Sequence, residues 1–335
     1  MAILVTGGAG YIGSHTVMYL KEQGEEVVVL DNLSKGHERA VDGVPFYQAD
    51  LTDGKVLDHI FTDRDIDSVI HFAASSLVGE SVTNPLEYYR NNVTGSHALV
   101  SKLVEYEVKY IVFSSTAATY GNPERTPIVE SDPTIPTNPY GETKLAIEKM
   151  LRWCDEAYGL KSTSLRYFNA AGADPEGRIG EDHDPESHLI PIVLQAALGQ
   201  REKVSIFGND YPTKDGTCVR DYIHVLDLAQ AHYLALKRMK ESNESNIFNL
   251  GNGKGFTVKE VIDTCRIVTE KEIVVEDASR RAGDPAVLIA SSQKAIKELG
   301  WKPVYPELQQ IVEHAWNWHQ NHPQGYKAGT VSLER

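Results

Sequence analysis

The sequence predicts an α/β protein with a parallel β-sheet covered by helices on both faces. Residues 1 to about 115 alternate short apolar runs with helical patterns, and this alternation is typical of parallel sheets. The first apolar run, residues 2–5, leads into three glycines spaced G-x-x-G-x-x-G and then into a helical pattern over residues 14–23. A strand, a glycine turn and a helix in this order indicate a Rossmann-type, doubly wound sheet.

The second half of the chain is organised differently. After residue 170 the alternation weakens and the loops lengthen. We therefore expect a nucleotide-binding Rossmann domain over residues 1–170 and a smaller mixed α/β lobe over residues 171–335. An apolar run near residues 247–251 fits a strand that returns to the main sheet.

Composition restricts the partners and the compartment. The chain has 335 residues and a net charge of −14, which argues against nucleic acid or an anionic membrane as the main partner. No apolar run approaches the length of a membrane span. The cysteines Cys154, Cys218 and Cys265 are few and odd in number, so a reducing cytosol is expected. The first residues already form the nucleotide strand, so no signal peptide is expected and the predicted location is cytoplasmic.

The glycine turn predicts a dinucleotide site. Glycine lets the backbone turn sharply and approach a pyrophosphate, while the first-turn N–H groups and the helix dipole attract the negative charge. The predicted cradle consists of Gly7, Gly10, Tyr11, Ile12 and Gly13.

An acidic residue after the second apolar run selects the cofactor. Residues 26–30 lead into Asp31, eighteen residues after Gly13. A carboxylate there accepts hydrogen bonds from the adenine ribose and repels a 2′-phosphate, so the predicted cofactor is NAD and not NADP. The polar loop that follows is placed to wrap the adenosine, and later strand ends are placed to reach the adenine edge and the pyrophosphate. These further expected cofactor contacts are Asn32, Leu33, Ser34, Lys35, Gly36, Asp50, Leu51, Phe72, Ala73 and Ala74.

Residues 85–106 predict one long amphipathic helix. Its apolar face consists of Leu86, Tyr89, Val93, Leu99 and Leu103, for which core packing is expected. Asn91 is the polar exception, and we expect it to face the sheet and to bond a buried backbone group or the cofactor.

The catalytic prediction combines a strand end with a helix start. The strand at residues 110–116 ends in three hydroxyl residues, and ligands of open α/β sheets bind at the carboxyl ends of the strands. Residues 138–144 then open a helix, with Asn138 as N-cap. Tyr140 and Lys144 stand four residues apart and therefore share one helix face.

These residue types support acid–base catalysis. A phenol has a pKa of about 10, and a nearby ammonium and a positive nicotinamide ring both lower it. Tyr140 is then able to take a proton from a substrate hydroxyl as hydride leaves the same carbon. Thr116 is expected to hold the substrate oxygen, and Lys144 to bind the nicotinamide ribose.

These motifs, with the run L-R-Y-F-N at residues 165–169, resemble the extended short-chain dehydrogenase/reductase superfamily. Within it, five motifs resemble the UDP-glucose 4-epimerase family: H-F-A at 71–73, V-G-E-S at 78–81, P-L-E-Y-Y at 85–89, F-G-N-D-Y-P at 207–212 and V-R-D-Y-I-H at 219–224. The resemblance covers residues 1 to about 326. It implies interconversion of UDP-glucose and UDP-galactose by reversible hydride transfer at C4 in galactose metabolism, with NAD retained, and a homodimer.

The resemblance also implies a nucleotide-sugar site in the second lobe. Phe168 would lie near the cofactor, and Ser76 stands where some relatives place a lysine against it. Arginines would neutralise the diphosphate, other residues would frame the uridine, and an acid would bind the ribose. The implied substrate contacts are Thr116, Tyr140, Asn169, His188, Leu189, Ser205, Ile206, Phe207, Arg220, Arg281, Asp284 and Leu288.

Two departures from the commonest family pattern bear on the substrate. His188 stands where asparagine is frequent, and Leu288 stands where some relatives have a bulky tyrosine that closes the sugar pocket. Leucine leaves room for an acetamido group, so UDP-N-acetylglucosamine and UDP-N-acetylgalactosamine are expected as additional substrates.

Two other functions compete with epimerisation. A sugar-nucleotide dehydratase or decarboxylase of the same superfamily would need an additional acid and base after the strand-end hydroxyl, where this chain has Ala117 and Ala118. A non-catalytic NAD sensor would not need Tyr140, Lys144 or Thr116, all of which are present.

No metal site is predicted. Asp182, His183, Asp184 and His188 do not follow a standard ligand spacing, and His319 and His322 are expected to be solvated.

Overall fold

The computed structural model describes residues 1–281 and 285–327. Its centre is a seven-stranded sheet in which every pair of neighbouring strands is parallel. In spatial order the strands are β11 (Asn246–Asn249), β6 (Lys161–Arg166), β5 (Tyr110–Ser114), β4 (Ile66–His71), β1 (Ala2–Thr6), β2 (Val27–Asp31) and β3 (Phe46–Gln48). The predicted Rossmann-type sheet is confirmed, and so is the returning strand, because β11 pairs with β6.

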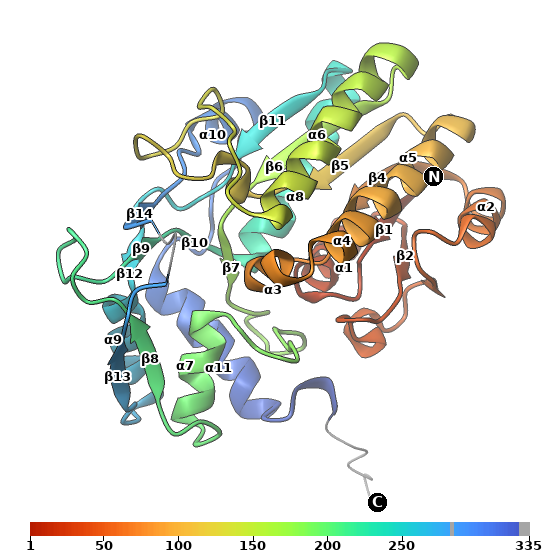
Figure 1. Ribbon diagram of the computed structural model, residues 1–335. Coiled ribbons are helices and arrows are strands. Elements are labelled where there is room, and N and C mark those ends of the chain that lie inside the picture. Colours follow the sequence, from red (N-terminus) through yellow and green to blue (C-terminus); the bar gives the residue numbers. More distant parts are fainter. Residues whose placement is uncertain (282–284, 328–335) are drawn as a thin grey trace, which may run out of the picture.

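Helices cover both faces of this sheet (Figure 1). One buried apolar cluster joins the sheet to α1 (Tyr11–Glu22), α8 (Val225–Ser242) and α10 (Gln293–Leu299). A second cluster on the opposite face joins it to α2 (Gly54–Asp63), α5 (Gly95–Glu105) and α6 (Pro139–Tyr158). Residues on both sides of position 170 therefore contribute to the core around the main sheet.

Most of the remaining elements after β6 form the smaller lobe, seen at the lower left of Figure 1. Its core lies between α7 (Leu189–Ala197), α9 (Val258–Thr269) and α11 (Leu308–Asn321). Short strands complete it: β7 (Asn169–Ala171), β8 (Val204–Phe207), β9 (Val219–Arg220), β10 (Tyr222–His224), β12 (Phe256–Thr257), β13 (Val275–Ala278) and β14 (Val287–Leu288). Among the described residues, no helix is long and apolar enough to cross a membrane.

The helix predicted over residues 85–106 is interrupted, and its predicted apolar face is wrong in the first half. After α3 (Val78–Thr83), the segment consists of α4 (Pro85–Tyr88), a π-helical turn (Tyr89–Thr94) and α5. The wider turn rotates the residues before it relative to those after it. Leu99 and Leu103 are buried as predicted, whereas Leu86 and Tyr89 are exposed.

Short 3₁₀ turns connect other elements, at Glu38–Val41, Ala117–Tyr120 and Gly325–Lys327. The prediction that the two histidines at the end of α11 are solvated is wrong for His319, while His322 is partly exposed. His319 is buried, and His322 stacks on the Trp318 ring with 3.9 Å between the ring centroids.

Candidate active site

The glycine loop joins β1 to α1 and is shaped for close backbone approach. Gly7 has φ of +70°, and a Cβ built there would lie 2.5 Å from the backbone nitrogen of Ala73. A Cβ on Gly13 would lie 2.1 Å from the Gly7 carbonyl oxygen. The first turn of α1 carries no acidic side chain, so its N–H groups and dipole remain suited to an anion.

Asp31 closes the loop from the end of β2. Its Oδ2 accepts from the backbone N–H of Ala9 at 3.0 Å, and its Oδ1 accepts from that of Leu33 at 2.8 Å. Burial raises the pKa of this carboxyl, and the two backbone hydrogen bonds oppose the shift. The hydrogen bond to Ala9 therefore holds Asp31 against the glycine loop.

The other predicted cofactor contacts lie at the same rim with mixed exposure. Asn32 Nδ2 donates to Asp50 Oδ2 at 3.1 Å, and Leu51 is buried beneath them. Lys35 points away toward the second lobe, where its Nζ donates to the Asp184 carbonyl at 2.5 Å. Tyr11 Oη likewise donates to the Gly172 carbonyl at 2.7 Å. Most of the remaining predicted residues are partly buried, namely Gly7, Ile12, Gly36, Phe72, Ala73 and Ala74, whereas Ser34 and Ser76 are exposed.

The polar residue that faces inward from the 85–106 segment is Asn92, one position after the predicted Asn91. Asn92 is fully buried, and its side chain bonds both the N–H and the carbonyl of Ser75 as well as Thr143 Oγ1. Asn91 is only partly buried and donates to Ser75 Oγ at 3.0 Å. The π-helical turn explains this one-residue difference, because it changes which side chain faces the sheet.

The predicted catalytic side chains meet at the carboxyl end of β5. Asn138 caps α6 as predicted, with its Oδ1 accepting from the Gly141 N–H at 2.9 Å. This start places the Tyr140 phenol close enough to the Thr116 side chain for Thr116 to lower its pKa. Burial raises the pKa of Tyr140 to about 12, and Thr116 partly opposes that rise.

Lys144 lies one turn further along α6 and is almost fully buried. Its Nζ donates to the Ser114 carbonyl at 2.8 Å and lies 6.0 Å from the centroid of the Tyr140 ring. Burial lowers the pKa of Lys144 to about 7, while the Glu148 carboxylate opposes that shift. A cation held beside the phenol favours the phenolate.

Below these groups lies a buried ion pair that the sequence did not single out. Arg166 and Glu148 form a two-pronged salt bridge, with Arg166 Nε donating to Glu148 Oε1 at 2.9 Å. Ser115 Oγ donates to the same Oε1 at 2.5 Å. Arg166 Nη1 also donates to Tyr120 Oη at 2.9 Å. The signal for this pair was available in the spacing, because Glu148 stands four residues after Lys144 on the same helix face.

A buried histidine under the cofactor strands was also missed. His71 Nδ1 bonds Thr6 Oγ1 at 2.7 Å and its Nε2 bonds Ser96 Oγ at 2.8 Å. Burial, with a smaller contribution from Lys144, lowers its pKa to about 3. His71 is therefore neutral and ties β1, β4 and α5 together.

The second lobe brings several predicted substrate residues together. In the small sheet Leu288 pairs with Arg220, and Arg220 Nη1 donates to the Pro285 carbonyl at 2.9 Å. Leu288 and Phe168 pack against the same small cluster, which is formed by Ala117, Tyr120 and Ile128. Leu288 therefore lies beside the turn that follows Thr116.

Some of the residues predicted to frame the uridine lie on β8 of the smaller lobe. The guanidinium of Arg281 lies 4.0 Å above the centre of the Phe207 ring, so these two pair as one unit. The Ile206 side chain points into the core of the lobe, because alternate residues of a strand face opposite sides, so the predicted contact would have to come from its backbone. Ser205 Oγ donates to Glu276 at 3.0 Å, Asn169 Nδ2 donates to the Asp221 carbonyl at 3.0 Å, and Asp284 lies outside the described residues.

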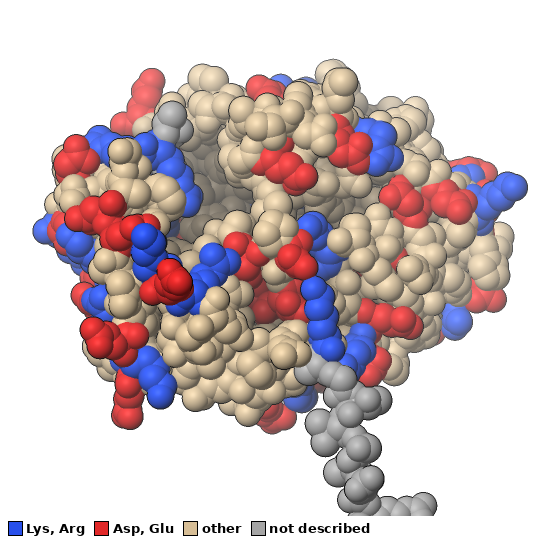
Figure 2. Space-filling model, turned by 60° about the horizontal axis from the view of Figure 1, so that its bottom comes forward, with Lys and Arg blue, Asp and Glu red and all other residues tan. Residues whose placement is uncertain are grey.

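His188 and Leu189 lie at the start of α7, where His188 is the N-cap residue. The His188 ring belongs to a cluster with Glu181, His183 and Glu186. Burial alone would lower the pKa of both histidines, but the two carboxylates raise the pKa of His183 to about 9 and that of His188 to about 10. Figure 2 shows a hollow in one face of the molecule, with both basic and acidic side chains around its rim.

Known proteins resemble this chain over nearly its whole length. The model of the NAD dependent epimerase/dehydratase family matches residues 3–251. The chain belongs to this family. A family member from Halalkalibacterium halodurans, a UDP-glucose 4-epimerase, is 69% identical over 97% of this chain and 98% of its own.

Solved structures of family members share the fold. The crystal structure of a UDP-glucose 4-epimerase superposes with a TM-score of 0.96 at 57% identity, over 98% of this chain and 100% of that one. The family member from Bifidobacterium longum, a UDP-glucose 4-epimerase solved in complex with NAD+ and UDP, superposes with a TM-score of 0.92 at 39% identity, over 97% and 100% of the two chains.

Proposed function

We propose that this chain is a UDP-glucose 4-epimerase that interconverts UDP-glucose and UDP-galactose with bound NAD and acts in galactose metabolism. The observation that carries the proposal is the arrangement of Thr116, Tyr140 and Lys144 at the carboxyl end of β5, at the same rim as the glycine loop. The 69% identity to a UDP-glucose 4-epimerase supports the same reaction.

The residues at the rim fit a dinucleotide. The glycine loop leaves no space for side chains at Gly7 and Gly13, and α1 presents its N-terminus without an acidic side chain. Asp31 is held at the end of β2, where a carboxylate can bind ribose hydroxyls. When bound in this cradle, NAD would supply the hydride acceptor and donor that epimerisation at C4 needs.

The chain's own residues manage the proton on the sugar O4. Tyr140 accepts it when hydride leaves and returns it when hydride comes back, acting as general base and then as general acid. In the absence of ligands, burial holds the pKa of the phenol at about 12, so the free side chain is protonated. The Lys144 ammonium favours the phenolate, and Thr116 holds O4 in line with the phenol.

The second lobe supplies the nucleotide-sugar site in this proposal. Arg220 and Arg281 neutralise the diphosphate, since a guanidinium forms paired hydrogen bonds with phosphate oxygens. Phe207 stacks beneath Arg281, and Leu288 borders the sugar. We propose residues 1–170 as the NAD-binding part and residues 171–335 as the sugar-nucleotide lobe, with β11 returned to the main sheet.

Dehydration is the weaker alternative. It needs an additional acid and base beside the strand-end hydroxyl, and Ala117 and Ala118 occupy those positions. Ala117 is buried against Tyr120 and Ile128, which leaves the turn apolar on that side.

The decisive experiment incubates the purified protein with UDP-galactose and no added NAD, and separates the products. We expect UDP-glucose at equilibrium with UDP-galactose, and NAD(H) released when the protein is denatured. Stoichiometric consumption of added NAD with formation of an oxidised sugar acid would contradict the proposal, as would a dehydrated product.

A homodimer in the cytoplasm completes the proposal. Val82, Leu86 and Tyr89 expose large apolar surfaces around α4, and Trp153 does so on α6, which packs beside α4. Exposed apolar patches of this kind mark interaction surfaces. Sedimentation analysis should give twice the chain mass, and Leu86→Glu should shift it to the monomer.

A further inference from the structure

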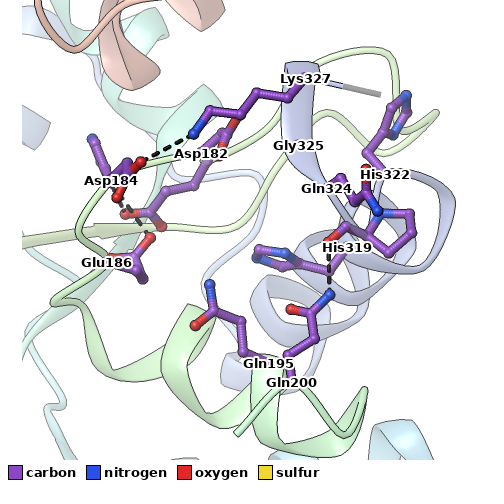
Figure 3. A pocket seen from close by; sticks show the side chains of 13 residues that line it. Asp182, Asp184, Glu186, Gln195, Gln200, His319, His322, Gln324, Gly325 and Lys327 are labelled. Atoms are coloured by element: carbon purple, nitrogen blue, oxygen red, sulfur yellow. Dashed lines mark hydrogen bonds and ion pairs between the residues drawn. The ribbon is translucent and has the colours of Figure 1, made fainter. Parts of the chain in front are cut away.

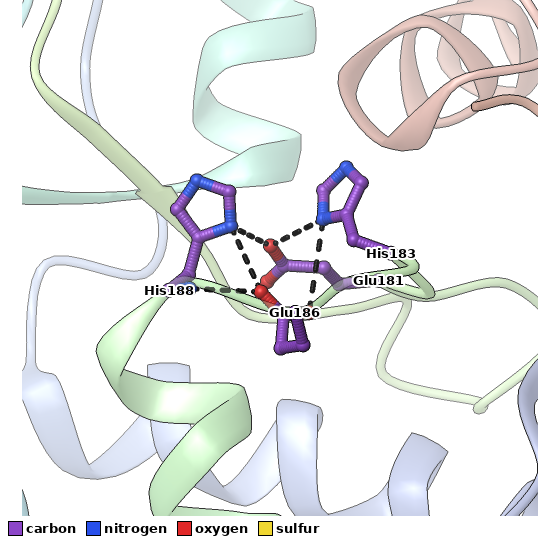
Figure 4. Close-up of side chains that lie close together, drawn as sticks. All are labelled: Glu181, His183, Glu186 and His188. Atoms are coloured by element: carbon purple, nitrogen blue, oxygen red, sulfur yellow. Dashed lines mark hydrogen bonds and ion pairs between the residues drawn. The ribbon is translucent and has the colours of Figure 1, made fainter. Parts of the chain in front are cut away.

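Four side chains with metal-binding chemistry converge in the loop before α7. They come from eight consecutive residues in the pattern E-x-H-x-x-E-x-H, namely Glu181, His183, Glu186 and His188 (Figure 4). Each offers one ligand atom, and these atoms all lie within 4.8 Å of one another. Both histidines turn the same atom, Nδ1, toward the same two carboxylates.

The spacing of these atoms is close to that of a tetrahedral coordination shell, and a rotation of the Glu186 carboxylate, whose two oxygens face different histidines, would complete it. Nδ1 of His188 lies 2.8 Å from Glu181 Oε1 and 3.1 Å from Glu186 Oε1. Nδ1 of His183 lies 3.1 Å from Glu181 Oε1 and 3.7 Å from Glu186 Oε2. Zinc–ligand bonds of about 2.0–2.2 Å to nitrogen and oxygen give tetrahedron edges of roughly 3.3–3.5 Å, which lies within the observed range.

The two buried carboxylates of this cluster need nearby positive charge to compensate them. The side chains of Glu181 and Glu186 are only 5% and 3% exposed, and two adjacent buried carboxylates are costly unless cations compensate them. Without an ion, the two protonated imidazoles supply this charge; one divalent ion would supply the same two charges at a single point and leave both imidazoles neutral, the form in which histidine binds metals.

The ligands are also oriented by neighbouring groups, as metal ligands usually are. Glu186 Oε1 accepts from the backbone N–H groups of Ser187 and His188 at 2.7 and 2.8 Å. Trp318 Nε1 donates to the Glu181 carbonyl at 3.1 Å. These contacts hold the Glu186 carboxylate and the Glu181 backbone in place before an ion arrives.

An entry route is present. The cluster borders a cavity of about 190 Å³, and Figure 3 shows Glu186 on its wall with Gln195 and His319 also lining it. A water molecule occupies about 30 Å³ of liquid, so this space admits a partly hydrated ion.

We propose that the loop at residues 181–188 binds one divalent transition-metal ion through these four side chains, with Zn²⁺ as the expected occupant. Imidazole and carboxylate ligands in a tetrahedral arrangement suit Zn²⁺. Four protein ligands complete the shell, so the ion has a structural role.

The position of the loop defines that role. The His183 ring packs edge-on against the ring of Tyr11 in the glycine loop, with 6.1 Å between centroids. The ion therefore braces the second lobe against the cofactor loop and sets the position of His188 at the start of α7.

The test measures bound metal on the purified, NAD-containing protein. The protein is stripped with a chelator, dialysed against Zn²⁺ and then against metal-free buffer, and analysed by mass spectrometry for zinc. Dialysis against Co²⁺ gives a second readout, because tetrahedral Co²⁺ has an intense visible absorption. We expect about one ion per chain and the tetrahedral Co²⁺ spectrum.

Two ligand variants and two matched controls locate the site. His183→Gln and Glu186→Gln each remove one ligand, so metal affinity should fall at least ~100-fold. His97→Gln and Glu176→Gln change exposed residues of the same types outside the cluster and should bind as the original chain does. Circular dichroism and the NAD content confirm folding of each variant.

Three outcomes would overturn the proposal. The first is folded original protein that retains less than about a tenth of an ion per chain, which would show that the cluster is an ion-pair network alone. The second is equal metal binding by the ligand variants and the controls. The third is a Co²⁺ spectrum of octahedral type, which would show a surface-bound ion. Epimerase activity enters none of these readouts, so failure of the proposed function leaves the test intact.

Discussion

Replacing Glu148 by glutamine should destabilise the protein strongly, because it leaves a buried guanidinium without its anion. The side chains of Glu148 and Arg166 are only 5% and 4% exposed. Burial alone would lower the pKa of Arg166, yet the Glu148 carboxylate raises it, so the arginine stays charged. Breaking a buried pair by removing one partner costs about 3–5 kcal/mol, a large share of the ~5–15 kcal/mol that stabilises a typical protein.

The assay is thermal unfolding of protein with matched NAD content, and the control is an exposed pair. Glu87 and Arg90 form a comparable salt bridge on the surface, with side chains 43% and 59% exposed. Glu87→Gln should cost less than about 1 kcal/mol. A double replacement, Glu148→Leu with Arg166→Met, should recover most of the stability lost in Glu148→Gln, because it removes both charges and keeps apolar volume.

The reasoning is refuted if Glu148→Gln lowers the midpoint of unfolding no more than Glu87→Gln does. It is also refuted if the double replacement is less stable than the single one. In that case the cost would come from packing or from the Ser115 hydrogen bond rather than from the unpaired charge.

Four further predictions follow from the same site. Tyr140→Phe should lower kcat for UDP-galactose by at least ~10²-fold while the NAD content per chain stays unchanged, since it removes the general base alone; near-normal turnover would direct attention to Thr116. Asp31→Ala should weaken NAD binding about 10–100-fold, the scale of a hydrogen bond to a charged group, and NAD content measured after gel filtration should drop accordingly. Lys144 has a pKa of about 7 in the folded protein and 10.5 as a free side chain. Between these two pH values the unfolded chain binds more protons than the folded chain. The contribution of Lys144 to the free energy of unfolding therefore rises with pH across that window. Lys144→Met should therefore unfold at a higher temperature than the original chain at pH 7. The gain in free energy of unfolding should be at most about 5 kcal/mol and should shrink toward pH 10. A gain that does not change with pH would contradict this prediction. Leu288→Tyr should suppress turnover of UDP-N-acetylgalactosamine more than that of UDP-galactose, and equal effects on both in matched assays would count against Leu288 as the boundary of the sugar pocket.

The parts of the fold that depend on local pattern were predictable from the sequence. The glycine loop, the placement of Asp31 after β2 and the Asn138 cap of α6 each require only a short run of residues and known backbone chemistry. The π-helical turn was not predictable, because it depends on how Asn92 reaches Ser75 and Thr143 from other elements. A 3.6-residue period assigned Leu86 to the core and Asn91 to the sheet, and the inserted turn made both assignments wrong.

Residues that act through partners far apart in sequence were harder to predict. The role of Glu148 was visible only in the structure. Its partner Arg166 comes from β6, and Tyr120, which Arg166 also contacts, bonds Asn249 of β11. The cluster of Glu181, His183, Glu186 and His188 was not predictable either, because the spacing in the sequence drew attention to Asp182, His183, Asp184 and His188. In the folded loop, the carboxylates of Glu181 and Glu186 face the two histidines instead.

One face of α6 explains how a buried amine can serve a catalytic phenol. Tyr140, Lys144 and Glu148 follow one another at intervals of four residues, so the proton acceptor, the cation and the anion stack along a single line. Burial drives the pKa of Lys144 down to about 7, which would leave it largely uncharged in weakly alkaline conditions. Glu148 opposes that shift from the turn below, and Arg166 keeps Glu148 in place by a two-pronged salt bridge. The ion pair therefore belongs to the electrostatics of the catalytic base as well as to the stability of the fold. Loss of Glu148 should in consequence shift the pH at which activity declines to lower values, even where the variant remains folded.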